Sequence, residues 1–250
     1  PREWSQSLEQ IACNYVGEEF ETKIGLPQGS VLAPTLFNIF INDLLGDILG
    51  DYTKFADDGT LWQTAQPDQI LELKDRMKDD ITKAVKWTQK WRVNINLDKT
   101  EICIFSKKNI DEEDKRILIQ GKELKYNSTP KLLGIIMDEK MTFSKHIDTI
   151  EKRANRNLTI LREVRQISKL KTEKLLQLYY SLVRSVMEYC SPAWQIAEPK
   201  DLQKLDRVQR KALILCMDMP TTSGREALEV ESGVMPIDTG THQTATCEVW

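Results

Sequence analysis

The sequence predicts an α+β protein, in which an antiparallel sheet with helices is followed by an all-helical region. Strand-like segments and turn signals occur among helical patterns up to about residue 140, and after about residue 142 the strand signals vanish and three long amphipathic helical patterns follow. With 250 residues, 40% hydrophobic and 29% charged, the composition is that of a globular protein of one large or two smaller domains. We therefore expect a domain or subdomain boundary near residue 140.

The first predicted elements surround a loop rich in glycine and proline. Residues 1–24 indicate a helix that runs into an extended segment, and the glycines and prolines of residues 25–34, GLPQGSVLAP, favour a loop. Pro34 suits the first turn of a helix, where its missing N–H is not needed. Apolar side chains continue on one helical face as far as Ile48, which predicts one helix over this stretch.

A hairpin and a second helix are predicted next. Asp51–Ala65 indicates two short strands around Asp57-Asp58-Gly59, since Asp and Gly are typical of hairpin turns. Asp68 is placed to cap a helix whose apolar side chains recur at steps of three and four residues. These apolar residues are Leu73, Met77, Ile81, Ala84 and Trp87 or Trp91.

Further strand-like segments lead to the helical part of the chain. They are TEICIFS at 100–106, RILIQGKELKY around a Gly121 turn, and KLLGIIMD at 131–138. The three helical patterns that follow cover roughly 144–168, 172–190 and 199–218. We assign no element to the tail after Pro220, which is rich in Thr, Gly and Glu.

Composition excludes several classes of protein. No apolar run approaches the roughly 18 residues that a membrane helix needs, because Pro34, Asn38 and Asn42 interrupt the best candidate. The first residues lack the basic and apolar pattern of a signal peptide. The five cysteines are odd in number and far apart, which fits neither a disulfide framework nor a zinc site. Free thiols predict a reducing compartment, nuclear or cytoplasmic, and the two histidines exclude an imidazole-rich metal site.

Asp57 and Asp58 form the first candidate site. Adjacent carboxylates repel one another, so either solvent at a turn or a bound cation must compensate for them. On the first alternative the pair belongs to a solvated hairpin turn. On the second, the turn holds a carboxylate at an exposed tip that suits Mg²⁺ (or Mn²⁺), which takes further ligands from substrate phosphates. Two such ions would activate an attacking hydroxyl and stabilise a leaving pyrophosphate.

The loop before the first predicted helix is the second candidate. Gln28 offers both a hydrogen-bond donor and an acceptor, and Gly29 allows another backbone or a ligand to approach closely. Ser30 precedes a helix whose first turn exposes amide groups to an anion. A loop that merely enters a helix explains the same residues, but its combination with an Asp-Asp hairpin is rarer by chance.

A basic stretch is the third candidate. The net charge of −3 argues against simple charge-driven binding to nucleic acid, but the charge is unevenly distributed. Between residues 152 and 174, eight Lys or Arg stand against two Glu. The apolar positions keep to one helical face, and Lys152, Arg153, Arg156 and Arg165 lie toward other faces. A solvated helix surface is the alternative to a phosphate-binding one.

Two motifs stand in order in the chain, PQGSVLAPTLFNIFINDL and FADD, and together they resemble the reverse transcriptases of non-LTR, LINE-like retrotransposons of the jockey group. The resemblance continues through LDKTEICIF, KLLGIIMD, HIDTIEKRANRNLTILREV and LQKLDRVQRKALILCMDMPTTSGREAL, and so covers nearly the whole chain. It implies a partial polymerase palm over 1–140, thumb-like helices over 141–195 and a truncated helical C-terminal region over 196–250.

The resemblance also implies an activity and partners. The activity is RNA-directed DNA polymerisation by two-metal nucleotidyl transfer, and the partners are an RNA template, a DNA primer and deoxynucleoside triphosphates. Asp57, with Asp58 beside it, would bind the catalytic Mg²⁺ or Mn²⁺. Gln28, Gly29 and Ser30 would lie against the incoming nucleotide and the template base. No membrane is implied, and the oligomeric state stays open.

Three further roles follow from the same resemblance. Lys99 would lie near the leaving pyrophosphate, and a solvated turn residue is the alternative. Leu133 and Gly134 would lie near the primer end, unless they are core residues of a strand. The side chains expected to contact the phosphates of the primer–template duplex are Lys152, Arg153 and Arg156.

One part of the family's pattern is missing. The resemblance implies a further metal-binding Asp well before the PQG loop, yet the first aspartate in this sequence is Asp43, after that loop. Because two aspartates without the third should hold the metals weakly, we expect the isolated chain not to polymerise. Three interpretations stay open: part of a polymerase, a non-catalytic nucleic-acid-binding remnant of a truncated element, or a decayed relic with an exposed sheet edge.

Overall fold

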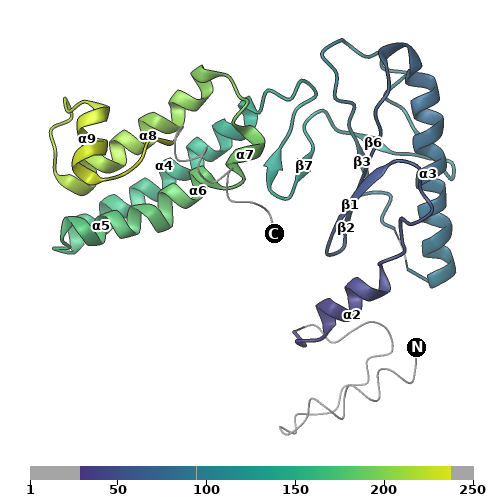
Figure 1. Ribbon diagram of the computed structural model, residues 1–250, viewed down its shortest axis with the longest axis horizontal. Coiled ribbons are helices and arrows are strands. Elements are labelled where there is room, and N and C mark those ends of the chain that lie inside the picture. The colour runs from purple at the N-terminus through teal and green to yellow at the C-terminus, as the bar shows by residue number, and fades with distance from the viewer. Residues whose placement is uncertain (1–28, 94, 238–250) are drawn as a thin grey trace, which may run out of the picture. The chain divides into compact units, whose positions relative to one another are not determined.

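The computed structural model describes residues 29–93 and 95–237 (Figure 1). Within them the chain forms two compact units. The N-terminal unit contains the described residues up to Thr100 together with Glu112–Leu124, and the C-terminal unit contains Glu101–Asp111 and the residues from Lys125 onward. The helix predicted within residues 1–24 lies outside the described residues.

The N-terminal unit begins with helix α2, Ala33–Phe40. Pro34 lies in its first turn as predicted, but the helix stops well before Ile48 and turns follow it. The predicted C-terminal end of this helix is therefore wrong. The carbonyl groups just after Phe40 accept hydrogen bonds from the ammonium group of Lys54, so a tertiary partner takes the place of further helical bonds.

A hairpin of two antiparallel strands follows, β1, Asp51–Phe55, and β2, Asp58–Trp62. It confirms the predicted hairpin. The register pairs Phe55 with Asp58, so that Ala56 and Asp57 are the two loop residues and Gly59 lies within β2. Ala56 has a φ angle of +52°, in the region that the favoured two-residue hairpin turns require.

Helix α3, Ile70–Trp91, follows a short 3₁₀ turn, η1, Pro67–Gln69. It confirms the predicted amphipathic helix, although Asp68 lies inside η1 and does not cap α3. The buried residues of α3 are Asp80, Ala84, Val85 and Thr88. The helix ends at Arg92, whose left-handed φ of +57° reverses the chain.

A second hairpin of this unit confirms the predicted turn at Gly121. Strand β4, Leu118–Ile119, pairs antiparallel with β5, Lys122–Glu123. The two loop residues, Gln120 and Gly121, have φ angles of +51° and +78°. Positive φ at both central residues is what a type I′ hairpin turn requires, and glycine adopts it without steric cost.

The C-terminal unit contains two small ladders before its helices. Strands β3, Glu101–Ile102, and β6, Lys125–Tyr126, pair in parallel. Strands β7, Lys131–Leu132, and β8, Ile135–Ile136, pair antiparallel. The segment 131–138 is thus a hairpin rather than the single strand suggested by its apolar run. The chain reverses because Leu133 and Gly134 have φ angles of +46° and +90°.

One antiparallel sheet was expected, and the described residues instead contain four two-stranded ladders, three antiparallel and one parallel. The coarser prediction, a mixture of helices and small sheets, is confirmed (Figure 1). Three of the ladders are local hairpins closed by their own turns. Because a hairpin satisfies half of its backbone groups by itself, local turn chemistry suffices to form it without the rest of a sheet.

Between β8 and α9, the described part of the C-terminal unit contains five helices and a π-helical turn. They are α4, Ser144–Ile167; α5, Thr172–Tyr179; the π-helical turn η2, Tyr180–Arg184; α6, Ser185–Glu188; α7, Ser191–Trp194; and α8, Pro199–Met217. The predicted ranges 144–168, 172–190 and 199–218 are confirmed to within two residues. A further helix, α9, Arg225–Ser232, was not predicted.

The main core lies among these helices, where α4 packs against α8 and the α5–η2–α6 segment (Figure 1). Its buried residues occur at helical spacing, as in Ile147, Ile150, Ala154, Leu158 and Leu161 of α4. Apolar surface removed from water at this spacing is what stabilises helices in a bundle. The predicted division into a palm, thumb-like helices and a C-terminal region stays a prediction.

Candidate functional site

The tip of the β1–β2 hairpin carries the two candidate metal ligands. Asp57 is the second loop residue, Asp58 is the first residue of β2, and both are exposed. Carboxylate oxygens are the hard donors that Mg²⁺ prefers, so the pair fits part of a magnesium shell. Among the described residues, no three His, Cys, Asp or Glu side chains gather to hold a metal ion. The remaining ligands would therefore come from outside this group of residues.

Lys54 fixes the hairpin to the end of α2. Its ammonium group donates hydrogen bonds to the carbonyl oxygens of Ile41, at 2.9 Å, and Asn42, at 2.7 Å. These carbonyls end the helical segment, where the helix dipole is negative and favours a cation. Lys54 lies three residues before Asp57, so this contact limits movement of the strand that leads to the tip.

Asp80 of α3 fixes the other end of the hairpin. It is 1% exposed, and its carboxylate accepts hydrogen bonds from the amides of Leu49, at 3.0 Å, and Gly50, at 2.9 Å. Gln63 Nε2, at 2.5 Å, and Lys83 Nζ, at 3.4 Å, complete the shell. Leu49 and Gly50 precede β1 and Gln63 follows β2, so one carboxylate joins both ends of the hairpin.

The environment of Asp80 also determines its ionisation. Burial by itself would raise the pKa of this carboxyl, but the hydrogen bonds from Leu49, Gly50, Gln63 and Lys83 outweigh burial and hold the pKa below its usual value. Sequence reasoning missed this residue. A signal was present, because Asp80 stands three residues after Met77 and four before Ala84, on the apolar face of the predicted helix.

The predicted nucleotide-binding loop is only partly within the described residues, since Gln28 lies outside them. Gly29 has a φ angle of +91°, which favours glycine. The hydroxyl of Ser30 accepts a hydrogen bond from the amide of Ala33 at 3.3 Å, so this side chain is engaged at the start of α2. Its predicted role in substrate binding stays a prediction.

Lys99 lies on an exposed turn, where its backbone amide donates to the carbonyl of Asn96 at 3.1 Å. Within the described part of the chain, no hydrogen bond or ion pair joins Lys99 to Asp57 or Asp58. Both the pyrophosphate role and the solvated-turn alternative are compatible with this position.

Leu133 and Gly134 form the tip of the β7–β8 hairpin. Leu133 is 42% exposed, which argues against the alternative of a buried core residue. The hydroxyl of Tyr189 donates a hydrogen bond to the carbonyl of Leu133 at 2.8 Å. The tip is therefore both accessible and held in place, although its predicted proximity to a primer end stays a prediction.

The basic residues of α4 fall into two groups. Lys152, Arg153 and Arg156 are exposed, away from the buried face that contains Ala154. Arg165 was expected away from the apolar face, on a solvated or phosphate-binding surface, but its side chain is only 27% exposed. Its guanidinium group donates to the carbonyl of Leu215 and pairs with Asp218, so it holds the end of α8 instead.

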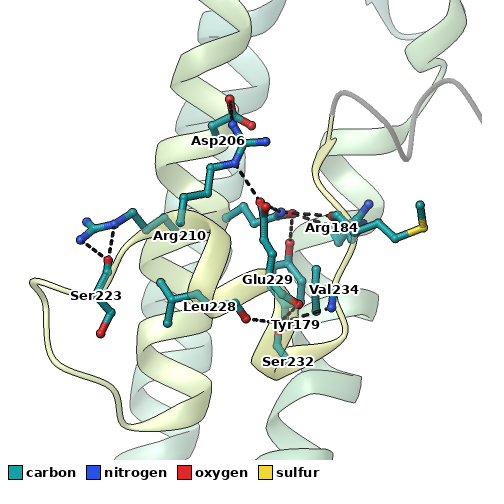
Figure 2. A network of polar contacts seen from close by, with 12 residues as sticks. Tyr179, Arg184, Asp206, Arg210, Ser223, Leu228, Glu229, Ser232 and Val234 are labelled. Atoms are coloured by element: carbon teal, nitrogen blue, oxygen red, sulfur yellow. Dashed lines mark hydrogen bonds and ion pairs between the residues drawn. The ribbon is translucent and has the colours of Figure 1, made fainter.

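A buried polar network lies between η2, α8 and α9 (Figure 2). Gln209 of α8 is at its centre: its amide oxygen accepts from the Tyr179 hydroxyl at 2.8 Å and from Arg184 Nη1 at 3.1 Å. Its amide nitrogen donates to Glu229 at 3.0 Å. Arg184 also donates to the carbonyl of Met235 at 2.5 Å. Because each buried polar group has a partner, the network specifies how α9 docks.

The family described as "Reverse transcriptase (RNA-dependent DNA polymerase)" matches residues 1–174. The chain therefore belongs to the reverse transcriptase family. Within that family it is similar to polymerases of non-LTR retrotransposons. No solved structure matches the chain.

Three relatives illustrate the similarity. The RNA-directed DNA polymerase from mobile element jockey of Drosophila funebris is 28% identical over 76% of this chain and 21% of its own length. The probable RNA-directed DNA polymerase from transposon X-element of Drosophila melanogaster is 24% identical over 78% of this chain and 22% of its own length. The retrovirus-related Pol polyprotein from type-1 retrotransposable element R1 2 of Nasonia vitripennis is 24% identical over 86% of this chain and 54% of its own length.

The chain spans about a fifth of the length of the jockey and X-element relatives that it matches. Functions of the whole relatives therefore apply to this chain only as proposals. None of the helices in the described ranges is long and apolar enough to span a membrane.

Proposed function

We propose that this chain is part of an RNA-directed DNA polymerase of a non-LTR retrotransposon and binds an RNA template paired with a DNA primer. The observation that carries the proposal is the position of Asp57 in the tight turn of the β1–β2 hairpin, whose two strand ends far from the turn are joined by Asp80. Membership of the reverse transcriptase family supports the substrate class. Free thiols at the described cysteines support a reducing location, nuclear or cytoplasmic.

The proposed chemistry is two-metal nucleotidyl transfer by the longer enzyme. Bound Mg²⁺ or Mn²⁺ ions would supply the charge that stabilises the attacking and leaving oxygens. Asp57 would hold these ions, with Asp58 beside it. Gln28, Gly29 and Ser30 would orient the deoxynucleoside triphosphate, and Lys99 would lie near the pyrophosphate that leaves.

A primer-extension assay with the 250-residue chain tests the catalytic part of the proposal. We expect no extension of a DNA primer on an RNA template with Mg²⁺ or Mn²⁺, because the described carboxylates supply only part of the metal shell. The chain with Asp57→Asn should be equally inactive. Extension that disappears with Asp57→Asn and persists with the matched strand variant Asp51→Asn would show that the chain polymerises alone.

A second candidate function, non-catalytic binding of nucleic acid, is favoured by the exposed side chains of Lys152, Arg153 and Arg156 on α4. Cations on one exposed helix can neutralise phosphates and release counterions. Binding would then weaken steeply as salt is added. This function does not require a complete metal site, so it applies to the chain as it stands.

Arg153→Ala/Arg156→Ala tests the phosphate contacts. In a titration of a primer–template duplex at several salt concentrations, the salt slope should fall by roughly one to two. The control is Arg207→Ala/Lys211→Ala, which removes the same charge from exposed positions on α8. An equal loss in both double variants would mean that only net charge matters, and a flat salt dependence in the wild type would contradict the proposal.

A further inference from the structure

The tip of the β7–β8 hairpin rests on one aromatic side chain, Tyr189. The Tyr189 hydroxyl donates to the Leu133 carbonyl at 2.8 Å. A Cβ atom placed on Gly134 would lie 3.4 Å from Cε1 of the Tyr189 ring, in direct van der Waals contact with it. Leu133 and Gly134 have φ angles of +46° and +90°, which reverse the chain at the tip beside that ring. The tip is therefore shaped around Tyr189.

Tyr189 is itself held by the helical core. The indole of Trp194, which is fully buried, donates a hydrogen bond from Nε1 to the Tyr189 carbonyl at 3.0 Å. Cys190, between them in the chain, adopts a φ angle of +50° and starts the short helix α7. The backbone of Tyr189 thus has a fixed position relative to the core, while 53% of the residue remains exposed beside the tip.

The base of the same hairpin is fixed to the start of α4. The Asp138 carboxylate accepts hydrogen bonds from the amides of Thr142, at 3.1 Å, and Phe143, at 2.8 Å. The amide of Ile136, in β8, donates to Nδ1 of the buried His146 at 3.3 Å. With Tyr189 at the tip, both ends of the hairpin are attached to the helices of one compact unit.

We infer that Tyr189 is a positioning residue that fixes the β7–β8 tip relative to α4, so that the tip and the exposed cations of α4 engage one primer–template duplex in a defined register. The inference rests on the proposed function, in which Leu133 and Gly134 lie at the primer end and Arg153 and Arg156 contact phosphates. Tyr189 acts through the Leu133 carbonyl.

This role differs from simple packing in what it predicts. If Tyr189 only stabilised the fold, loss of its hydroxyl would weaken binding of the whole duplex, and its effect would be equal at the primer terminus and at internal positions. If it positions the tip, overall affinity stays with the phosphate contacts, and only the environment of the primer terminus changes. Tyr189→Phe separates the two cases, since it keeps the ring and removes the hydroxyl together with its hydrogen bond to the Leu133 carbonyl and its interaction with Cys190.

The experiment uses the 250-residue chain and a DNA primer annealed to an RNA template. One duplex carries 2-aminopurine as the 3′-terminal primer base, and a second carries it at an internal position. For Tyr189→Phe we expect a dissociation constant within about twofold of the wild-type value. The fluorescence of the internal 2-aminopurine should be unchanged. The fluorescence change that binding causes at the terminal 2-aminopurine should fall by at least half. The control is Tyr180→Phe, an exposed tyrosine in η2 that makes no contact with Leu133 or Gly134.

A measurement without ligand examines the tip directly. Loss of the hydrogen bond to the Leu133 carbonyl should make amide hydrogen exchange at Gly134 and Ile135 about fivefold faster in Tyr189→Phe. Gly134→Ala should give the same terminal defect, because it adds both a positive-φ penalty and a contact with Tyr189. Gly121→Ala is the matched control, with a φ of +78° but nothing within 4 Å of its added Cβ.

The outcomes separate the two proposals. If the wild type binds with salt dependence and Tyr189→Phe matches it in terminal signal and in exchange, the positioning role is wrong and the proposed function stands. Equal losses at the terminal and internal probes would also overturn it, because they indicate a general effect on folding. If the wild type does not bind the duplex, the proposed function fails and the positioning role fails with it.

Discussion

At the scale of single residues, Asp80 joins the two ends of the hairpin that carries the candidate metal site. An ordinary aspartate on a helix faces water, whereas this one is buried and accepts two backbone amide hydrogens and one side-chain amide hydrogen. Removing the charge would leave buried donors without an acceptor, which costs more than the bond itself contributes.

Asp80→Asn should lower the free energy of unfolding by about 1–3 kcal/mol, because the amide presents a donor where Leu49 or Gly50 also donates. Urea denaturation at neutral pH measures this. Asp79→Asn, at an exposed neighbouring position, is the control and should change little. Equal losses in the two variants would contradict the role assigned to Asp80.

The contribution of Asp80 to the free energy of unfolding should also depend on pH. The pKa of Asp80 is lowered in the folded chain from its ordinary value of 3.8, so its contribution is fully present above that value. The contribution is lost as the pH falls below 3.8 and through the folded-state pKa. Wild type should therefore lose more stability than Asp80→Asn between neutral pH and pH 3, measured by denaturation in urea.

At the scale of elements, the docking of α9 depends on the buried network around Gln209, to which α9 contributes Arg225 and Glu229. Glu229 connects Gln209 to Arg225, which in turn pairs with Asp206 of α8 at 2.7 Å (Figure 2). The π-helical turn η2 contains Arg184, which reaches the same centre. Buried charges in such a network are destabilising when one partner is removed.

Gln209→Leu should destabilise the C-terminal unit by about 3 kcal/mol and expose α9 to proteases, because Arg184 and Tyr179 lose an acceptor. Thermal denaturation and limited proteolysis measure the two effects. The control is Gln203→Leu, at an exposed position of α8. Wild-type stability in the Gln209 variant would mean that apolar packing alone docks α9.

At the scale of the whole molecule, the two units differ in how much apolar surface they bury. Twenty of the buried hydrophobic residues in the described ranges form the core cluster of the C-terminal unit. The other seven, Ile41, Leu45, Ala84, Val85, Ile117, Ile119 and Leu124, lie in the N-terminal unit. Since stability scales with buried apolar area, the unit that holds the hairpin of Asp57 should be the less stable one.

Unfolding in urea should therefore occur in two steps, with the N-terminal unit first. Hydrogen exchange of peptides from α3 and from α4 and α8 distinguishes the steps. Ile147→Ala, which empties a fully buried position of α4, should lower the stability of the second step by about 2–5 kcal/mol and leave the first unchanged. A single transition with one midpoint for all peptides would contradict this order.

Sequence reasoning succeeded where one local signal decided the structure. The helical repeats predicted α4, α8 and the α5–η2–α6 segment closely, and Asp-Gly and Gly121 predicted two hairpins. It failed where a local signal was ambiguous. The apolar run at 131–138 is equally compatible with one strand and with a hairpin, and α9 has only two buried residues, Leu228 and Glu229, too few to form a visible repeat.

By itself, the sequence determined the family of this protein, the positions of its long helices and the place of Asp57 in a hairpin. These properties depend on residue order and on periodicities within short segments. Only the tertiary structure decided that Asp80 joins the ends of that hairpin, that Arg165 holds α8, and that Tyr189 contacts the tip of another hairpin. The partners of Asp80 and Tyr189 are 31 and 56 residues away along the chain, and no local pattern encodes a contact at that separation.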